Sequence, residues 1–546
     1  MTVSLKNKIM CITLAAGLVA GCQKDNDKFF PDPYAGGKPQ LGVKFSEALP
    51  SPSSGAAGEK VTYSVRGLLA YKDSIHFFQN GEEAAISSVT DSTLTVVVPA
   101  QASTGTGWVT IGAQVFPAPL FRVRGKARLD NTFKSGSGTD GLIYQIIPTS
   151  DNRYLLTGSF RLYNSNGQGN WLNGIAKIEK HGQYVTDMST DSAAGRNGRI
   201  HSAAELEDGR FIVAGAFSTY GYKKGLFNFA RVNISGKIDT TVQTVIPEEY
   251  NYDPDAGLPD MTEALSKDTV SAFNGGSSSA PTKIFARNGR VIAFGSLGLY
   301  QQIFYKSSTR NAKVTDRRVV HSVMAMDLDG NLDSTYHYDL ANHEGMPGAD
   351  GYLADAILMY DGKLVMVGKF PRFDGVTAGN IARLDANGRV DNTFKAGSGA
   401  NGDVFSITFN KTTRKFLITG NFTSYNGQPC HGLMLLNEDG SPVTNFQTDV
   451  FLNGYATYAM QLKNGMIVVT GGFEKYGTRI RRGMVILNAD GSYAAAYNNT
   501  GDLNGAVYGM LETTSAEGET AVLIYGYIPS FDNTNVGNIF RLVLAK

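Results

Sequence analysis

FLITGNF, at residues 416–422, decides the fold because the chain writes the same pattern seven times. An apolar run ends in a glycine, and a large apolar residue follows two positions later. The pattern returns as LLTGSF, IVAGAF, VIAFGSL, LVMVGKF, IVVTGGF and VLIYGYI. We call the shared glycine the marker glycine of its unit, and the seven are Gly158, Gly215, Gly295, Gly368, Gly420, Gly471 and Gly526. A repeat of this kind indicates a solenoid, a propeller or an array.

Each unit contains enough strand-like runs for a small sheet. A run such as DVFSITFN precedes the marker, and IARLD at residues 381–385 shows the run that follows it. A turn (DANG) and a short fourth run (DNTF) complete the unit. Four strands per unit favour the blade of a β-propeller over the alternative, a solenoid. The sequence therefore predicts an all-β chain with a seven-bladed β-propeller at residues 125–546.

A near-duplicate stretch predicts how the ring closes. RLDNTFKSGSG at residues 128–138 repeats RVDNTFKAGSG at residues 389–399, yet no unit precedes the first copy. The last unit ends in NIFRLVLAK and lacks its fourth strand. We expect the segment at residues 128–133 to supply that strand, so that no sheet edge stays open.

The segment at residues 41–124 predicts a separate β-sandwich. KVTYSVRGL, TLTVVVP and GWVTIGA alternate polar and apolar residues, and turn residues bound each run. The stretch GEKVTYSVRG and the ending SVTDSTLTVVVPAQASTGTGWVTI resemble an IPT/TIG domain, an immunoglobulin-like module. The repeats resemble the delta-60 type of propeller repeat, most closely in RLDANGRVDNTFKAGSG. The first resemblance implies a spacer or docking module, and the second implies a propeller without specifying its activity.

The first residues predict export. Two lysines precede CITLAAGLVAG, an apolar run too short to span a bilayer as a helix. The run ends in LVAGC, which resembles the lipobox of bacterial lipoproteins. This resemblance implies a signal peptide at residues 1–21, lipidation of Cys22 and a tether at residues 22–40. The acidic residues after Cys22 resemble the surface-export signal of Bacteroidota lipoproteins. An ordinary signal peptide with a chance cysteine is the alternative.

Composition excludes several classes of function. The net charge is +1, with no long basic run, so nucleic acid is not an expected partner. Cys430 is the one cysteine after Cys22, which excludes a disulfide framework or a cysteine metal site in the mature chain. No motif indicates a cofactor. DLDGNLDST, which begins at Asp327 and includes Asp333, starts like a calcium loop but lacks the closing glutamate, so we interpret it as a β-turn before a metal site.

Two long loops interrupt the otherwise compact units. One, at residues 241–282, joins units two and three, and the other, at residues 298–320, lies between the second and third strands of unit three. A smaller enlargement lies at residues 161–174. Because strands alternate in direction, all three emerge on one face of the ring. Long loops in a compact domain are usually functional or disordered, so we expect any ligand on this face.

Aromatic residues divide into shared and exceptional ones. An aromatic follows every marker glycine by five positions, and such a shared residue indicates blade packing. Exceptional aromatics, in the enlarged loops and in the corresponding loop of unit two, are better candidates for binding, because rings with polar neighbours suit sugars. The predicted ligand-binding residues are Trp171, Tyr222, Phe227 and Tyr305, and Tyr250 and Tyr252 are weaker candidates. The alternative is that these rings only hold the loops in place.

No residues are predicted to be catalytic. The chain has no HExxH, no GxSxG and no P-loop. The architecture resembles accessory lipoproteins of Bacteroidota uptake systems, which implies capture of an extracellular glycan beside a SusC/SusD-type transporter at the outer membrane. Two alternatives stay open. In the first, the propeller is a protein-interaction or adhesion subunit. In the second, it is a polysaccharide-degrading enzyme.

Overall fold

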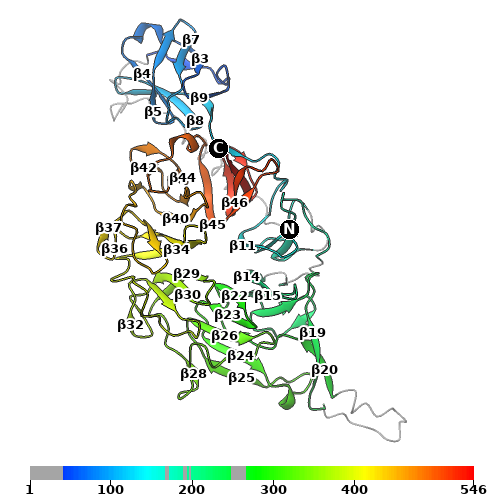
Figure 1. Ribbon diagram of the computed structural model, residues 1–546. Coiled ribbons are helices and arrows are strands. Elements are labelled where there is room, and N and C mark those ends of the chain that lie inside the picture. Colours follow the sequence, from blue (N-terminus) through cyan, green and yellow to red (C-terminus); the bar gives the residue numbers. More distant parts are fainter. Residues whose placement is uncertain (1–40, 166–170, 189–193, 196–197, 248–265) are drawn as a thin grey trace, which may run out of the picture.

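The protein has two β domains joined end to end. The computed structural model describes residues 41–165, 171–188, 194–195, 198–247 and 266–546. Cys22, Tyr250 and Tyr252 lie outside these residues. Figure 1 shows the smaller domain beside one edge of a ring of sheets. The helical elements are short 3-10 turns such as η1 (Leu69–Tyr71) and η4 (Ala495–Tyr497), and none in the described part of the chain could span a membrane.

The N-terminal domain is a sandwich of two sheets, as predicted. Their strand orders are β1-β3-β7-β6 and β2-β9-β8-β4-β5. Along β3, Val61, Tyr63 and Val65 are buried and alternate with more exposed residues, because successive side chains of a strand point to opposite faces. The bounds are β1 Lys44–Phe45, β2 Ser54–Ala56, β3 Lys60–Arg66, β4 Ile75–Gln79, β5 Glu82–Ala84, β6 Ile86–Val89, β7 Thr93–Val97, β8 Gly105–Ile111 and β9 Gln114–Arg124.

Seven further sheets form the blades, which confirms the predicted propeller and its blade number. Each blade has an inner, a second and a third strand, and in blades 1 to 6 a single bridge, such as Leu384↔Val390, replaces the short fourth strand. The strands, blade by blade, are β11 (Ile143–Pro148), β12 (Tyr154–Gly158) and β13 (Ile175–Ile178); β14 (Arg199–Glu205), β15 (Phe211–Ala216) and β18 (Phe229–Val232); β22 (Lys283–Arg287), β23 (Arg290–Phe294) and β26 (Val323–Asp327); β29 (Tyr352–Leu358), β30 (Leu364–Lys369) and β33 (Ile381–Leu384); β34 (Asp403–Asn410), β35 (Lys415–Asn421) and β38 (Leu433–Asn437); β40 (Ala456–Gln461), β41 (Ile467–Gly471) and β44 (Met484–Leu487); β45 (Leu503–Thr514), β46 (Thr520–Phe531) and β48 (Ile539–Leu544).

The marker glycines allow a close approach between strands. In six blades the register shifts opposite the marker, so that the inner strand carries one extra residue, a β-bulge. A Cβ on Gly158 would overlap the carbonyl oxygen of Leu142, and a Cβ on Gly420 would overlap that of Asp403. Neither glycine has a positive φ, so missing volume rather than backbone freedom explains the residue type.

The aromatic residues that follow the markers are buried, which confirms the packing role. Each is at most 1% exposed: Tyr163, Tyr220, Tyr300, Phe373, Tyr425, Tyr476 and Phe531. Every tyrosine of this set donates its hydroxyl hydrogen bond to the carbonyl of the turn glycine of its own blade, as Tyr425 does to Gly440 at 2.9 Å. The ring fills the core, and the hydroxyl fixes the turn after the third strand.

The chain closes the ring with its N-terminal segment, as predicted. Strand β10 (Ala127–Leu129) pairs antiparallel with β48, so the last blade is completed from the other end of the domain. Asp130 then accepts a 2.6 Å hydrogen bond from Arg541, and Thr132 accepts another from the same guanidinium. Both charged side chains are almost fully buried, Arg541 at 0% and Asp130 at 3% exposed.

The duplicated stretch repeats this arrangement in blade 4. Arg383 bonds Asp391 at 2.9 Å and Thr393 at 3.1 Å, and it also donates to the carbonyl of Glu438 in blade 5. Arg541 likewise reaches the carbonyl of Lys180 in blade 1. The shared letters therefore connect neighbouring blades, and they indicate no ligand.

The sandwich is fixed to blades 6 and 7 (Figure 1). The Asn499 side chain donates to the carbonyls of Val123 and Ala127 and accepts from the Ala127 amide, so it holds the link between the domains. Its own carbonyl accepts the amide of Thr104 at 2.8 Å. These contacts join a loop of blade 6 to the end of β9.

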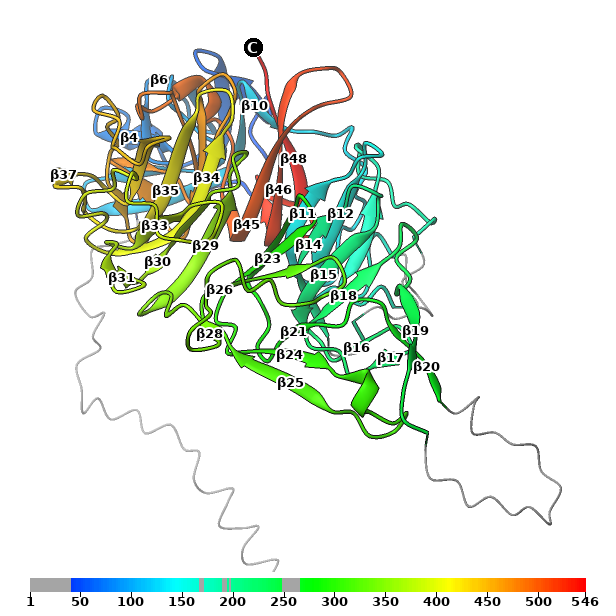
Figure 2. The same cartoon turned by 60° about the horizontal axis from the view of Figure 1, so that its bottom comes forward.

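The long loops form an extra structure on blades 2 and 3, which we call the appendage. It comprises β19 (Thr240–Thr244), β20 (Lys267–Ser271), β21 (Gly276–Ser277), β24 (Leu299–Ile303), η3 (Tyr305–Ser307) and β25 (Thr315–Val319). Val245, Val270 and Tyr305 form its small core. Figure 2 shows β19, β20, β24 and β25 projecting together from the ring, and Figure 1 places them across the ring from the sandwich.

Candidate functional site

A pocket of about 400 Å³ opens where the insertions meet, and we call it the insertion pocket. The loop of blade 2 contributes Phe227, the segment after β19 contributes Ser271, and the loop of blade 3 contributes Tyr305 and Lys313. Three segments that are separate in sequence thus surround one cavity. The loops between second and third strands and the loop that leads into the inner strand of blade 3 lie side by side, as the alternation of strand direction requires.

Hydrogen bonds hold the wall that carries Phe227. The Phe227 carbonyl accepts the Ser277 amide at 3.0 Å, and the Asn228 side chain donates to the Ser277 carbonyl at 2.9 Å. The short hairpin of β16 (Thr219–Tyr220) and β17 (Lys223–Lys224) adds the bond from Lys223 to the Thr269 carbonyl. The loop of blade 2 is therefore attached to the insertion that follows it.

The opposite wall is held by cationic side chains. Lys313 pairs with Asp268 at 2.6 Å, and the Arg310 guanidinium donates to the Lys267 carbonyl at 2.5 Å. The Lys313 ammonium also lies 5.5 Å from the centre of the Tyr305 ring. Burial, followed by the nearby Asp268 carboxylate, raises the pKa of Tyr305 to about 12, so its hydroxyl stays protonated at neutral pH.

The structure brings two of the four predicted residues into this pocket. Phe227 is half-buried and lines it, whereas Tyr305 is 8% exposed and forms a packed wall. Tyr222 is 70% exposed, but its side chain lies outside the pocket lining. Trp171 is exposed on blade 1, where the Arg161 guanidinium lies 5.6 Å from its ring, and it too lies outside the lining.

Sequence reasoning missed the polar side of the pocket. The Ser271 hydroxyl oxygen is buried in the wall and has no hydrogen-bond partner among the residues that the structure describes. An unpaired buried hydroxyl is costly unless a ligand or a water completes it. A serine inside a long loop carries no sequence signal of its own. The pairing of β19 with β20 brings it here.

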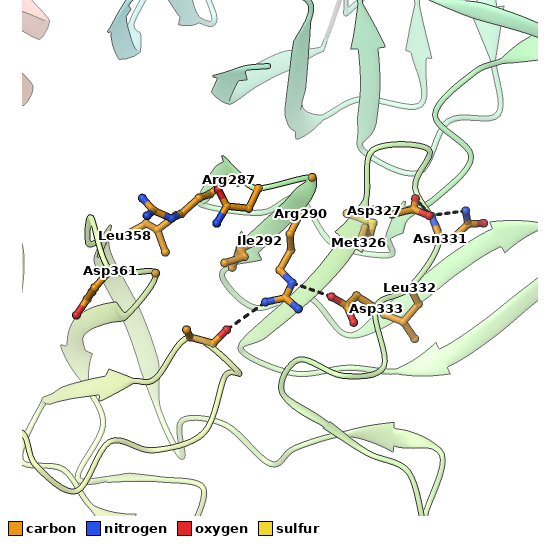
Figure 3. Close-up of a pocket in the computed structure, with 14 residues that line it drawn as sticks. Arg287, Arg290, Ile292, Met326, Asp327, Asn331, Leu332, Asp333, Leu358 and Asp361 are labelled. Carbon is orange, nitrogen blue, oxygen red and sulfur yellow. Dashed lines mark hydrogen bonds and ion pairs between the residues drawn. The ribbon is translucent and has the colours of Figure 1, made fainter. Parts of the chain in front are cut away.

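A pocket of about 560 Å³ between blades 3 and 4, shown in Figure 3, lies on the opposite face and contains the calcium-like stretch. The Asp327 carboxylate accepts the amides of Asp329 and Asn331, which makes the stretch a β-turn. Arg290 bonds Asp333 at 2.7 Å and the carbonyl of Ala386 in blade 4 at 3.1 Å. Its charges thus link neighbouring blades, and the described residues contain no cluster of three or more His, Cys, Asp or Glu side chains suited to a metal.

Two family models match parts of the chain. A domain of unknown function, DUF5008, matches residues 18–119, which include most of the sandwich. The β-propeller domain of unknown function DUF5122 matches residues 361–394 and 414–446, in blades 4 and 5. No curated protein matches the chain.

Several solved structures are similar to the chain. The WD40 β-propeller domain of Doa1 is 13% identical with a TM-score of 0.40, and the match covers 76% of this chain and 96% of that one. YCF48 bound to D1 peptide is 10% identical with a TM-score of 0.36, covering 77% and 96%. YCF48 from Cyanidioschyzon merolae is 11% identical with a TM-score of 0.34, covering 74% and 96%. These similarities concern the fold alone.

Proposed function

We propose that the protein is a surface lipoprotein that captures an extracellular carbohydrate in the insertion pocket, without catalysis. The observation that carries the proposal is the meeting of two insertions and the loop of blade 2 around one pocket that contains Phe227. The compact units lack these two insertions, so the insertions are additional to what the ring needs for folding. Additional loops positioned by a rigid scaffold commonly carry function.

The chemistry of the pocket suits a sugar. The Phe227 ring offers an apolar face, and the polar side chains of Asp268 and Lys313 line the same pocket. Sugars present an apolar ring face bordered by hydroxyl groups. Nine of the 18 lining residues are polar or charged and the rest are apolar or glycine, so the lining offers both an apolar face and hydrogen-bonding groups.

The arrangement of the domains supports a role at the cell surface. The lipobox-like stretch predicts an anchor at Cys22, before the sandwich in the sequence. The appendage lies across the ring from the sandwich. An anchored chain would thus hold the insertion pocket on the side away from the membrane. A SusC/SusD-type transporter is the proposed recipient of the captured ligand, and an anchor keeps their effective concentrations high.

Affinity electrophoresis in gels that contain soluble polysaccharides tests the proposal. We expect retardation by at least one polysaccharide and loss of that retardation in Phe227→Ala. Trp171→Ala is the matched control, because Trp171 lies outside the insertion pocket. Retardation that survives Phe227→Ala but not Trp171→Ala would move the site to blade 1. Release of reducing ends during incubation would favour the enzyme alternative.

A protein-docking role is the second candidate, because exposed apolar side chains lie on the appendage. Val242 is 60% exposed, Phe304 52% and Val314 47%. Exposed apolar side chains that gather on one projection often mark a protein interface. Phe304→Ser tests this candidate. If the variant loses co-purification with a transporter but keeps its retardation by polysaccharide, this surface binds a protein partner and the pocket binds the sugar.

A further inference from the structure

A second cavity, of about 620 Å³, lies on the axis of the ring, and we call it the axial cup. It is lined by residues of the seven inner strands or of the segments directly before them. These residues are Tyr144, Gln145, His201, Thr282, Lys283, Tyr352, Ala354, Asp355, Phe405, Ser406, Thr457, Tyr458, Ala506, Val507 and Tyr508. A cavity to which every blade contributes is not a crevice between two neighbours. Its volume is in the usual range of ligand pockets.

The β-bulges place one residue of each affected blade in this cavity. The bulge residue opposite the marker glycine is Tyr144, His201, Ala354, Phe405, Thr457 or Tyr508, in blades 1, 2, 4, 5, 6 and 7. All six line the axial cup. Bulges leave a residue unpaired and redirect its side chain, and they are frequent beside active sites. The repeated glycine therefore also serves to direct one side chain per blade to the axis.

The directed residues make an aromatic wall. The Tyr144 ring lies 5.9 Å from the Tyr508 ring and 5.2 Å from the His201 ring, and Phe405 adds a further ring to the lining. Tyr508 is 43% exposed and Tyr352 is 64% exposed. Rings that only filled a core would be buried, as the aromatics that follow the marker glycines are. Rings that stay open toward a shared cavity are available for stacking.

The charges of the axial cup are compensated within it. Lys283, from blade 3, pairs with Asp355 of blade 4, and Asp355 also accepts the amide of Ile407 at 3.1 Å. Blade 3 has a regular register here and contributes this lysine in place of a bulge residue. The pair leaves no net charge for an ionic ligand to meet.

His201 adds a neutral acceptor. Its Nδ1 lies 3.0 Å from the Pro281 carbonyl, which can only accept, so Nδ1 carries the hydrogen. Burial lowers the pKa of His201 below its usual value, so the ring is neutral at neutral pH. The Nε2 lone pair then faces no partner among the described residues and can accept a hydroxyl hydrogen.

We infer that the axial cup is a second binding site, which takes a neutral carbohydrate by stacking on Tyr144, Phe405 and Tyr508. The aromatic faces match the apolar faces of pyranose rings, and the neutral polar groups match their hydroxyls. A carboxylated or sulfated sugar would have to displace the Lys283–Asp355 pair to find a counter-charge. This inference shares the ligand class of the proposed function but none of its residues, so each can fail without the other.

Calorimetric titration of the full mature chain with cellohexaose, xylohexaose, mannohexaose and maltohexaose tests the inference. We expect at least one of these neutral oligosaccharides to bind. We expect its Kd to rise about tenfold in Tyr144→Ala and in Phe405→Ala, which corresponds to about 1.4 kcal/mol for each. Tyr144→Phe keeps the ring face and should stay within about twofold of the wild type.

Two control variants distinguish binding in the axial cup from binding elsewhere on the protein. Tyr360→Ala removes a half-exposed ring outside the cup, and its Kd should equal that of the wild type. Phe227→Ala tests the insertion pocket in the same titrations. If Phe227→Ala abolishes binding and Tyr144→Ala does not, the proposed function stands and the axial site is wrong. Binding of none of the four oligosaccharides, or equal effects of Tyr144→Ala and Tyr360→Ala, would also overturn the inference.

Discussion

At the residue scale, two adjacent glycines in blade 6 separate volume from conformation. A Cβ on Gly471, the marker, would overlap the carbonyl oxygen of Tyr455, whereas a Cβ on Gly472 meets nothing within 4 Å. Neither has a positive φ. We expect Gly471→Ala to lower the free energy of unfolding by about 1–3 kcal/mol, as overpacking does, and Gly472→Ala to change it little or raise it slightly. Urea unfolding of both variants measures this, and equal effects would contradict the role of the marker glycine at the bulge.

The carboxylate of Asp391 gives the repeated network a pH dependence. Burial alone would raise its pKa, but the hydrogen bonds from Thr393 and the charge of Arg383 outweigh burial and hold the pKa at about 2. An aspartate in the unfolded chain has a pKa of about 3.9. The network therefore stabilises the folded state above about pH 4, and this stabilisation is lost as the pH falls toward 2. The full effect is roughly 2 kcal/mol.

Unfolding of Asp391→Asn at several pH values checks that effect. The variant should be less stable than the wild type at pH 7, and the gap should narrow by roughly 2 kcal/mol as the pH falls from 7 to about 2. Arg383 is largely buried, so loss of its partner leaves an uncompensated charge at neutral pH. A gap that is constant over this range would show that Asp391 is not ionised by the network.

Residues that serve every blade could be predicted from the sequence, and residues that serve one cavity largely could not. Gly420 and Tyr425 recur in register, so repetition alone indicated a role in folding. The bulge residues have a fixed place before the marker but vary in type, as Tyr144, His201 and Thr457 show. Because the residue type varies, the sequence alone does not show that these positions share a role; the register shift in the structure does. Phe227 was predicted because it is an aromatic residue outside the set that all units share.

At the element scale, β10 decides whether the propeller is one closed unit. It pairs with β48 and brings Asp130 to the buried Arg541. Replacing residues 128–133 by a glycine-serine segment of equal length keeps the spacing but removes this strand and its charge. We expect a loss of at least about 3 kcal/mol, because a buried guanidinium is left unpaired and the edge of β48 is opened.

Thermal unfolding followed by circular dichroism measures the loss, and a replacement elsewhere gives the matched control. Residues 411–414 form the hairpin turn between β34 and β35, and they contact the neighbouring blades through the side chains of Thr413 and Arg414 without supplying a strand to either, so the same glycine-serine exchange there should cost less. If the two exchanges lower the melting temperature equally, the segment at residues 128–133 does not close the ring. The sequence predicted this element because the last unit was one strand short.

At the scale of the whole molecule, the two domains were predictable but their orientation was not. Alternation along β3 and the repeated glycines define each domain from local patterns. The joint depends on Asn499 and on Thr104, Val123 and Ala127, which lie hundreds of positions earlier in the chain. An asparagine in a loop of one blade has no local signal for such a role.

The joint predicts that the sandwich is a rigid arm, and Asn499→Ala tests this. The side chain is 7% exposed and makes three hydrogen bonds at the joint, one to the Val123 carbonyl of the sandwich and two to the backbone groups of Ala127 in β10. Its loss leaves buried backbone groups unpaired, which costs more than the mean value of a hydrogen bond. Domains without a strong interface move relative to each other.

We therefore expect Asn499→Ala to show faster proteolysis between β9 and β10 and a larger radius of gyration in small-angle scattering. Gln101→Ala, which removes only the exposed bond to Arg479, is the control and should leave both unchanged. A sandwich that stays equally protected in Asn499→Ala would show that apolar packing at the joint, rather than this side chain, sets the distance between an anchored N-terminus and the appendage.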